Sequence, residues 1–194
     1  MTASRQHPLP PNAGQHGMND RASDERELVT RTMRGDERAF TALYAAHAPA
    51  AYGAAYRLCG NAPDAEDVTQ ELFLALPASL TAYDPSRGAL GPWLRRVAVR
   101  LALMRMRSVR RRREVDAGSV AELLARDDRA LERLSIEAAL ARLSDEQRTV
   151  FLLKEVEGYE HRQIASMLEI SVANSEVRLF RARQSLRILL GGSR

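Results

Sequence analysis

Apolar residues recur at the three- and four-residue spacing of α-helices along nearly the whole chain. No stretch alternates convincingly between apolar and polar residues, as a half-buried strand would. Ala and Leu are plentiful and aromatic residues make up only 5% of the chain, which favours helix bundles. The pattern predicts an all-α protein of two helical domains joined by a flexible linker, the C-terminal domain carrying a helix-turn-helix.

The first helical domain is predicted over residues 25–113. Its expected helices are Glu25–Arg34, Asp36–Cys59, Ala62–Leu76 and Gly91–Arg113. Pro49 is expected to kink or split the second helix, because proline removes a backbone hydrogen bond. Asn61 can cap the third helix, with Pro63 in its first turn. Residues 84–88 form a predicted turn or loop before the fourth helix.

The remaining segments differ in composition. Residues 114–134 are acidic and lack core-like spacing, which predicts the linker. A second helical domain is expected over residues 135–194, where Ser144 and Gln147 form a capping box for a helix Asp145–Val156 and Gly158 is placed to end it. Residues 1–24 are rich in Pro, Gly, Asn and Ser and lack the apolar core of a signal peptide, so we expect a disordered tail.

The segment His161–Arg183 carries the most specific local pattern. It predicts a short helix, a tight turn and a second helix bearing Arg178, Arg181 and Arg183, with Ser171 placed to cap that helix. In a helix-turn-helix the second helix enters the major groove of DNA. The shape alone fits a solvated surface helix equally well, so its interpretation depends on the rest of the chain.

The fourth predicted helix is strongly basic. One face carries Trp93, Val97, Leu101 and Met104. The other faces carry arginines with no acidic residue among them: Arg95, Arg96, Arg100, Arg105, Arg107 and Arg110–Arg113. Such a run is often solvated or disordered, and a basic amphipathic helix can lie on a membrane. Nucleic-acid binding is favoured, because mutual repulsion destabilises the helix unless a polyanion relieves it.

The third predicted helix presents acidic and amide groups over Asp64–Phe73, while Val68, Leu72 and Phe73 face inward. Paired carboxylates could indicate a metal site or acid–base catalysis, but no histidine lies nearby and the acids fan around the helix. A solvated helix with a favourable acidic first turn is the simplest alternative. A charged docking face for a protein partner is the third.

Composition narrows the function classes. The net charge is +4, and Lys154 is the single lysine beside many arginines, a preference that codon bias in a GC-rich genome largely explains. Cys59 is the only cysteine, which excludes an internal disulfide and a cysteine-based zinc site. The four histidines are scattered, so we expect no metal, no cofactor and no enzymatic activity. No run approaches the roughly 20 apolar residues of a spanning helix, so we expect a cytoplasmic protein without membrane insertion.

Taken in order, several motifs resemble one family. They are GDERAFTALYAAHAP, DAEDVTQELFLAL, YDPSRGALGPWL with its arginine run, and LSDEQRTVFLLKEVEGYEHRQIASMLEIS followed by VRLFRARQSLR. Together they resemble the extracytoplasmic-function (ECF) group of bacterial RNA polymerase sigma factors, over residues 25–190. The resemblance implies a two-domain initiation factor that binds core RNA polymerase and promoter DNA. It also implies an anti-sigma factor as inhibitor, and a linker that threads the polymerase.

The resemblance implies roles for particular residues. Those matching the segment that docks on the polymerase are Asp64, Glu66, Asp67, Gln70, Glu71 and Phe73. Those matching the segment that recognises and melts the minus-ten element are Trp93, Arg95, Arg96, Arg100, Arg107, Arg110 and Arg111. Those matching the reader of the minus-thirty-five element are Ser171, Ala173, Asn174, Ser175, Arg178, Arg181 and Arg183.

The chain departs from the family pattern at several positions, which are Pro77, Val99-Arg100, Met104, Glu160, Glu169, Ser175 and Glu176. Pro77 could end the third helix early, and Glu169 stands where a usual glycine would accept a positive φ. Glu160 replaces a usual Ser or Thr cap. The others affect base capture, local packing and groove contacts, so we expect altered sequence preference. Two alternatives stay open: a stand-alone helix-turn-helix regulator, and a sigma-like protein that binds polymerase or an inhibitor but no promoter.

Overall fold

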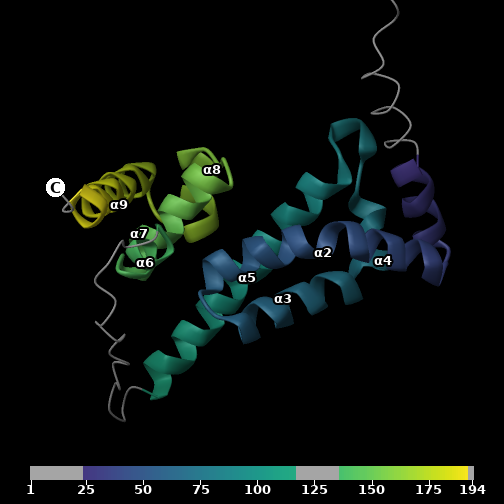
Figure 1. The fold of residues 1–194 in the computed structure, drawn as a ribbon, viewed down its shortest axis with the longest axis horizontal. Coiled ribbons are helices and arrows are strands. Elements are labelled where there is room, and N and C mark those ends of the chain that lie inside the picture. The colour runs from purple at the N-terminus through teal and green to yellow at the C-terminus, as the bar shows by residue number, and fades with distance from the viewer. Residues whose placement is uncertain (1–23, 117–135, 192–194) are drawn as a thin grey trace, which may run out of the picture.

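The computed structural model describes residues 24–116 and 136–191, and Figure 1 shows their arrangement. Every regular element within these two ranges is a helix, which confirms the all-α prediction. The predicted tail, apart from Asp24, lies outside the described residues, as do residues 117–134 of the predicted linker.

The N-terminal body begins with a helical segment over residues 24–33. Its other elements are α2 (Glu37–Cys59), α3 (Ala62–Leu74), α4 (Leu76–Ser79), the 3-10 turns η1 (Leu80–Ala82) and η2 (Pro85–Arg87), and α5 (Leu90–Asp116). Helices α2, α3 and α5 pack on one another, and Leu43, Leu72, Leu76, Leu90 and Leu94 are buried between them. Burying such apolar surface is the main stabilising contribution to a small domain of this kind.

Local sequence signals explain where these helices begin and end. Asp36 Oδ1 accepts hydrogen bonds from the backbone N–H groups of Arg38 and Ala39 at the start of α2. Asn61 Oδ1 accepts from Asp64 N at 2.9 Å, as the predicted cap of α3 requires. Gly60 ends α2 with φ 75°, a left-handed conformation that favours glycine.

Three predicted helix features need correction. Pro49 does not split α2, because the small side chains around it are buried against neighbouring helices and hold the helix together across one missing hydrogen bond. Helix α3 ends at Leu74, two residues before its predicted bound but early as Pro77 indicated, and the chain restarts as α4 with Pro77 in its first turn. Helix α5 runs to Asp116, so the first three residues of the predicted linker are helical.

The C-terminal body contains α6 (Ile136–Ala141), α7 (Asp145–Phe151), the π-helical turn η3 (Leu152–Val156), α8 (His161–Leu168) and α9 (Val172–Gly191). Ser144 Oγ accepts from Gln147 N at 3.3 Å and caps α7. The predicted helix Asp145–Val156 is therefore present, but its second half is π-helical. Helices α8 and α9, joined by a three-residue turn, confirm the helix-turn-helix.

The two bodies lie against each other where the end of α2 and the middle of α5 meet α7, η3 and α8 (Figure 1). One cluster of buried apolar side chains crosses the contact, with Leu58 and Val99 on one side and Val150, Leu153 and Ile164 on the other. The prediction of two helical domains is confirmed. The sequence pattern did not predict that they dock on each other.

Candidate nucleic-acid and partner interfaces

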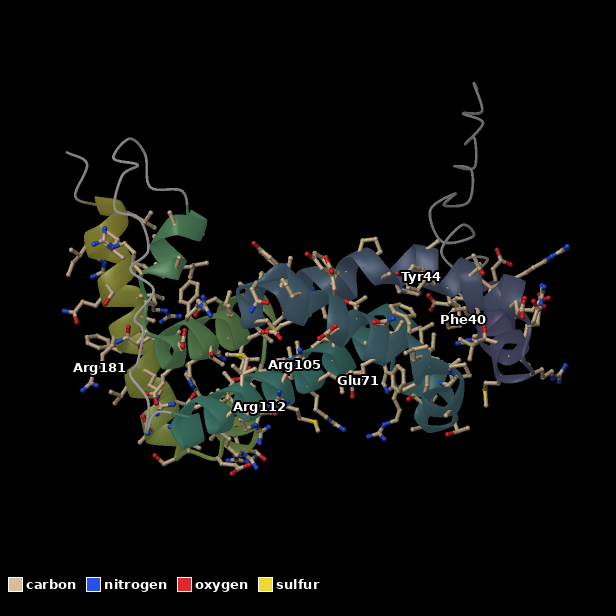
Figure 2. The ribbon with its side chains drawn as sticks, turned by 90° about the horizontal axis from the view of Figure 1, so that it is seen from below. Phe40, Tyr44, Glu71, Arg105, Arg112 and Arg181 are labelled. Carbon is tan, nitrogen blue, oxygen red and sulfur yellow. The ribbon has the colours of Figure 1, made fainter. Side chains whose placement is uncertain are left out.

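The acidic face of α3 is exposed but partly neutralised. Glu66, Gln70 and Glu71 are exposed on it (Figure 2 labels Glu71). Arg105 of α5 lies beside the same helix and donates through Nε to Asp64 Oδ1 at 2.8 Å and through Nη2 to Asp67 Oδ2 at 2.6 Å. These carboxylates hold the pKa of Arg105 above its usual range. Arg105 thus faces α3, and the acidic face offers less free charge than the sequence implies.

Phe73 is a core residue and does not belong to the exposed docking face. It is 2% exposed, and its ring meets the edge of the Tyr44 ring with centroids 4.7 Å apart. Its prediction as an exposed contact on the α3 face therefore needs correction, although it is one of the residues that line the groove described next. The inward-facing periodicity of Val68, Leu72 and Phe73 in the sequence already indicated its burial.

A shallow, mainly apolar groove follows α2 and α3 beside Phe73. Phe40, Tyr44 and Pro49 line it from α2, and Gln70 and Leu74 line it from α3 (Figure 2 labels Phe40 and Tyr44). Tyr44 and Leu74 are 45% and 76% exposed. Sequence reasoning missed this groove, although large apolar residues at helical spacing on α2 were a usable signal.

The arginines of α5 form two groups. Arg96, Arg100, Arg110 and Arg111 are exposed along the helix. Near its start, Trp93 is half-buried, and its ring lies 5.5 Å from that of Tyr83, which precedes η2. This end of α5 therefore combines aromatic rings with an exposed arginine, Arg96, and surfaces that bind single-stranded nucleic acid often combine these groups.

Arg95 and Arg107, predicted to contact DNA, are instead engaged by the C-terminal body. Arg95 Nη2 donates to Glu157 Oε1 at 3.0 Å, and its Nε donates to the other oxygen of that carboxylate. This hydrogen bonding raises the pKa of Arg95. Arg107 Nη1 donates to Glu169 Oε1 at 2.9 Å. Three of the arginines judged uncompensated from sequence, Arg95, Arg105 and Arg107, therefore have acidic partners.

The start of α9 is ordered as predicted. Ser171 Oγ accepts from Asn174 N at 3.1 Å, and both residues are exposed beside Ala173. Ser175 is fully buried, and its hydroxyl lies 2.9 Å from Nδ1 of His161. Its predicted contact with DNA needs correction, because it faces α8. Ser175 lies four residues before the buried Leu179, a spacing that would have placed it on the inner face.

The three arginines predicted on α9 have different surroundings. Arg178, 19% exposed, pairs with Glu146 of α7 at 3.0 Å, and Arg183 pairs with Glu155. Arg181 is exposed and forms no ion pair with any residue of the two described ranges. Figure 2 shows it on the outer side of α9. Val177 and Phe180 are 45% and 67% exposed, and neither was predicted from the sequence as a DNA-contacting residue.

The helix-turn-helix turn carries a strained residue. Glu169 adopts φ 57° and ψ 43°, a left-handed conformation that glycine would take without cost. At the start of α8, the backbone N–H of Glu160 donates to Gln163 Oε1 at 2.9 Å. The Glu160 carboxylate accepts from Lys154, which lowers its pKa. Glu160 thus takes part in a capping interaction at the start of α8, whereas Glu169 adopts the left-handed turn conformation at an energetic cost.

Two other kinds of site were sought in the described residues. Over 24–116 and 136–191 no group of three or more histidine, cysteine or acidic side chains could hold a metal ion. Among the helices of those ranges, none has the length and apolar character needed to cross a membrane.

Sequence comparisons match both bodies. Residues 43–113 match the family model described as sigma-70 region 2, and residues 133–186 match that described as sigma-70, region 4. The Pseudomonas aeruginosa RNA polymerase sigma-H factor is 31% identical over 180 residues, 84% of this chain and 91% of that protein. The ECF RNA polymerase sigma factor SigE of Mycolicibacterium smegmatis is 34% identical over 152 residues, 73% of this chain and 57% of that longer protein.

Solved structures share the fold. CnrH, solved in complex with the cytosolic domain of CnrY, superposes with a TM-score of 0.50 at 30% identity, over 88% of this chain and 99% of that one. The sigma factor RpoE of Bartonella quintana, solved with the anti-sigma factor NepR, gives a TM-score of 0.54 at 23% identity, over 80% and 98%. The latter supports the fold alone.

A helical region 2 followed by a helix-turn-helix region 4 defines the sigma-70 class of RNA polymerase sigma factors, and this chain belongs to that family. Within the class, its relatives place it in the ECF group.

Proposed function

We propose that this protein binds core RNA polymerase and directs it to specific promoters, where it starts transcription. The observation that carries the proposal is the placement of two basic helices on separate bodies, α5 beside the acidic helix α3 in one body and α9 in the other. One basic helix would serve each promoter element, and the acidic helix would serve the polymerase. We assign core binding and minus-ten recognition to residues 25–113, and minus-thirty-five recognition to residues 135–194.

The proposed polymerase contact is the exposed face of α3 with the adjacent groove. Glu66, Gln70 and Glu71 supply polar groups, and Tyr44 and Leu74 supply exposed apolar surface beside them. Charge complementarity at such a surface would speed association and fix the register of docking. Asp64 and Asp67 belong to this face as well, but Arg105 already holds them.

The proposed minus-ten surface is the outer side of α5 with the Tyr83–Trp93 pair. Arg96, Arg100, Arg110 and Arg111 are exposed along it and can neutralise backbone phosphates, although Arg110 already takes part in another interaction. Extruding a base from the duplex costs a few kcal/mol, which phosphate contacts and stacking would offset. Arg95 and Arg107 belong to this surface but must first leave Glu157 and Glu169.

The proposed minus-thirty-five reader is the exposed face of α9. Ser171, Ala173, Asn174 and Arg181 lie on it, with Val177 and Phe180 beside them. Arg181 is suited to a bidentate contact with guanine, and the apolar residues to a thymine methyl group. Arg178 and Arg183 would take part only after leaving their acidic partners.

The remaining roles follow from this assignment. Sigma factors of the family are not enzymes in themselves, and we propose that this chain has no catalysis or cofactor of its own. It would act in the cytoplasm, where polymerase and DNA are. The structures of related sigma factors with NepR and with the cytosolic domain of CnrY support the proposal that an anti-sigma factor binds this chain.

Reconstitution tests the proposal. Purified protein added to core polymerase should co-elute with it and give transcripts from one class of promoter. Glu71→Arg should weaken that binding at least tenfold, because it reverses an exposed charge on α3. Glu37→Arg, an exposed reversal on α2, is the matched control. Wild-type protein that binds promoter DNA but no polymerase would favour a stand-alone regulator.

A further inference from the structure

One carboxylate of the first helical segment, residues 24–33, contacts both α2 and the start of α5. The backbone N–H of Leu90, the first residue of α5, donates to Glu25 Oε2 at 3.3 Å. The other oxygen, Oε1, lies 3.1 Å from His47 Nε2 of α2. Figure 1 shows the first segment, in purple, near the teal turn that leads into α5. Three elements far apart in the sequence therefore meet at Glu25.

The backbone N–H of Leu90 needs this acceptor. The first N–H groups of a helix have no partner within the helix, and Leu90 is fully buried, so water does not reach it. An unpaired buried donor is costly. A carboxylate also interacts favourably with the positive end of the helix dipole. Glu25 therefore acts as a cap for α5 that comes from a distant part of the chain.

His47 orients the capping carboxylate. The side chains of His47 and Glu25 are both half-buried. A Cβ atom at position 91 would lie 3.5 Å from Cε1 and Nδ1 of His47, so the imidazole also packs against the first turn of α5 at Gly91. Because its two oxygens are held by different elements, the carboxylate has little freedom to rotate. His47 thus keeps Oε2 of Glu25 directed at α5.

The start of α5 in turn positions the two aromatic rings of the proposed minus-ten surface. Tyr83 Oη donates to the Gly88 carbonyl at 3.0 Å, two residues before Leu90. Its ring lies 5.5 Å from that of Trp93, in the first turn of α5. Burial, and then the negative charge of Glu25, raise the pKa of the Tyr83 hydroxyl. A shift of this turn away from the first segment would therefore move the ring pair.

Apolar packing holds these elements together independently of the Glu25 contacts. Val29 of the first segment is buried in one core cluster with Leu43 of α2 and with Leu90 and Leu94 of α5. Partly exposed charged pairs contribute little to stability by comparison. Loss of the carboxylate should therefore leave the N-terminal body folded and change mainly the position of the first turn of α5.

We propose that Glu25 and His47 are positioning residues for promoter recognition. They fix the first turn of α5 and so hold the rings of Tyr83 and Trp93 where a single-stranded minus-ten element can stack on them. Neither positioning residue contacts the DNA. The proposal rests on the proposed function, because it takes this end of α5 as the minus-ten surface. Sequence analysis did not find the pair, since Glu25 and Leu90 are 65 residues apart.

Trp93 is the only tryptophan of the chain, so its fluorescence reports this site directly. In the free full-length protein, Glu25→Ala should shift the emission of Trp93 to longer wavelength and increase its quenching by acrylamide, because the ring becomes more exposed. Glu27→Ala is the matched control, since Glu27 lies on the same segment, is exposed and reaches only Arg31, at 3.8 Å. Thermal melts of each variant show whether it is folded.

The second measurement is DNA binding by the holoenzyme. The protein is reconstituted with core polymerase and titrated with a fluorescein-labelled non-template oligonucleotide carrying the minus-ten element of a promoter mapped with the wild-type protein. Glu25→Ala should weaken this binding roughly three- to tenfold, because the rings occupy the receptive position for a smaller fraction of the time. Glu25→Gln, which keeps an oxygen for the N–H of Leu90, should bind more tightly than Glu25→Ala. Binding to a duplex that carries only the minus-thirty-five element should not change.

A double-mutant cycle tests whether the two residues act as a pair. His47→Phe keeps a ring against Gly91 but cannot hold the carboxylate, so it should weaken minus-ten binding less than Glu25→Ala. Combining it with Glu25→Ala should cause little further loss, since His47 acts through Glu25. Should Glu25→Ala melt below the assay temperature, His47→Phe carries the same comparison with the control.

Three results would overturn the proposal. The first is a folded Glu25→Ala variant, or His47→Phe in its place, that matches Glu27→Ala in Trp93 emission or in minus-ten binding. The second is full additivity of the two losses in the double mutant. The third is an equal loss of minus-ten and minus-thirty-five binding, which would assign Glu25 a purely structural role.

Failure of the proposed function would look different. Wild-type protein that gives core polymerase no promoter selectivity would contradict the function, while Trp93 emission would still report whether Glu25 holds the start of α5. Wild-type protein that supports promoter-specific transcription while Glu25→Ala binds the minus-ten oligonucleotide like the control would reject the positioning role alone.

Discussion

Arg105 lies 2.8 Å from Asp64, so the basic helix α5 is joined to the acidic helix α3 by an ion pair within the N-terminal body. A second carboxylate, that of Asp67, contacts the same guanidinium at 2.6 Å. One arginine of the basic run therefore stabilises the packing of two helices. Its neighbours on the outer side of α5 remain exposed.

Arg105→Ala should accordingly behave as a stability variant. We expect a loss of about 1 kcal/mol or less in the free energy of unfolding, since the pair is partly exposed. The salt dependence of DNA binding should not change. Arg100→Ala, the matched control on the exposed side, should leave stability intact and reduce the log–log salt slope by roughly 0.7 to 0.9. Equal slopes for both variants would contradict this division.

The arginines of α9 should likewise divide into one that contacts DNA and one that stabilises the fold. Arg181→Ala should weaken binding to minus-thirty-five duplex by about 1–3 kcal/mol, the range of a bidentate base contact, without changing stability or polymerase binding. Arg178→Ala should lower stability, because it leaves Glu146 without its partner and removes a side chain that is 19% exposed. Binding titrations with thermal melts distinguish the two. A melting temperature lowered equally by both substitutions would contradict the prediction.

Glu169 should limit the stability of the helix-turn-helix. Glu169→Gly removes the left-handed strain, and Glu169→Ala keeps it; both lose the ion pair with Arg107. We expect the glycine variant to be more stable than the alanine variant by about 1 kcal/mol, a shift of about 2–4 °C in melting temperature. A glycine variant no more stable than the alanine variant would show that the turn is unstrained.

Cys59 should react slowly with alkylating agents. Burial, followed by the charge of Asp64, raises the pKa of its thiol from 9.0 to about 11. At pH 8 the thiolate fraction should therefore be roughly a hundredfold below that of an ordinary cysteine, and the iodoacetamide rate should rise tenfold per pH unit up to about pH 11. The denatured chain is the control, and a rate that levels off near pH 9 would contradict the prediction.

The same shift makes stability depend on pH. Because the folded pKa of Cys59 lies above the unfolded value, its contribution is fully present below about pH 9 and is lost as the pH rises towards 11. Cys59→Ala should remove this component from the alkaline decline in melting temperature. A decline of the same size in both proteins would assign it to other groups.

Local signals in the sequence predicted much of the fold. The predicted helix caps are present at Asn61, Ser144 and Ser171. They could be predicted because a capping interaction joins residues only two or three positions apart in the sequence. The helix-turn-helix followed from apolar spacing on both sides of one turn. Pro77 correctly indicated the early end of α3.

The interfaces were less predictable. Glu157 and Arg95 are 62 residues apart, and no local pattern shows that a carboxylate of one body will meet a guanidinium of the other. The docking of the two bodies depends on many such tertiary contacts at once. For Ser175 and Phe73, by contrast, helical periodicity alone predicts a buried position on the inner face of the helix. The resemblance to the family assigned them contacts with DNA and polymerase, but both side chains are buried in the structure.

Transcription from a promoter library measures whether this chain gives core polymerase its promoter selectivity. Core polymerase should be incubated with this protein, and transcripts from a promoter library should be sequenced with and without Arg181→Ala. We expect polymerase-dependent transcripts that share minus-thirty-five and minus-ten elements, with selection for the upstream element lost in the variant. Polymerase that gains no promoter selectivity from the wild-type protein would contradict it.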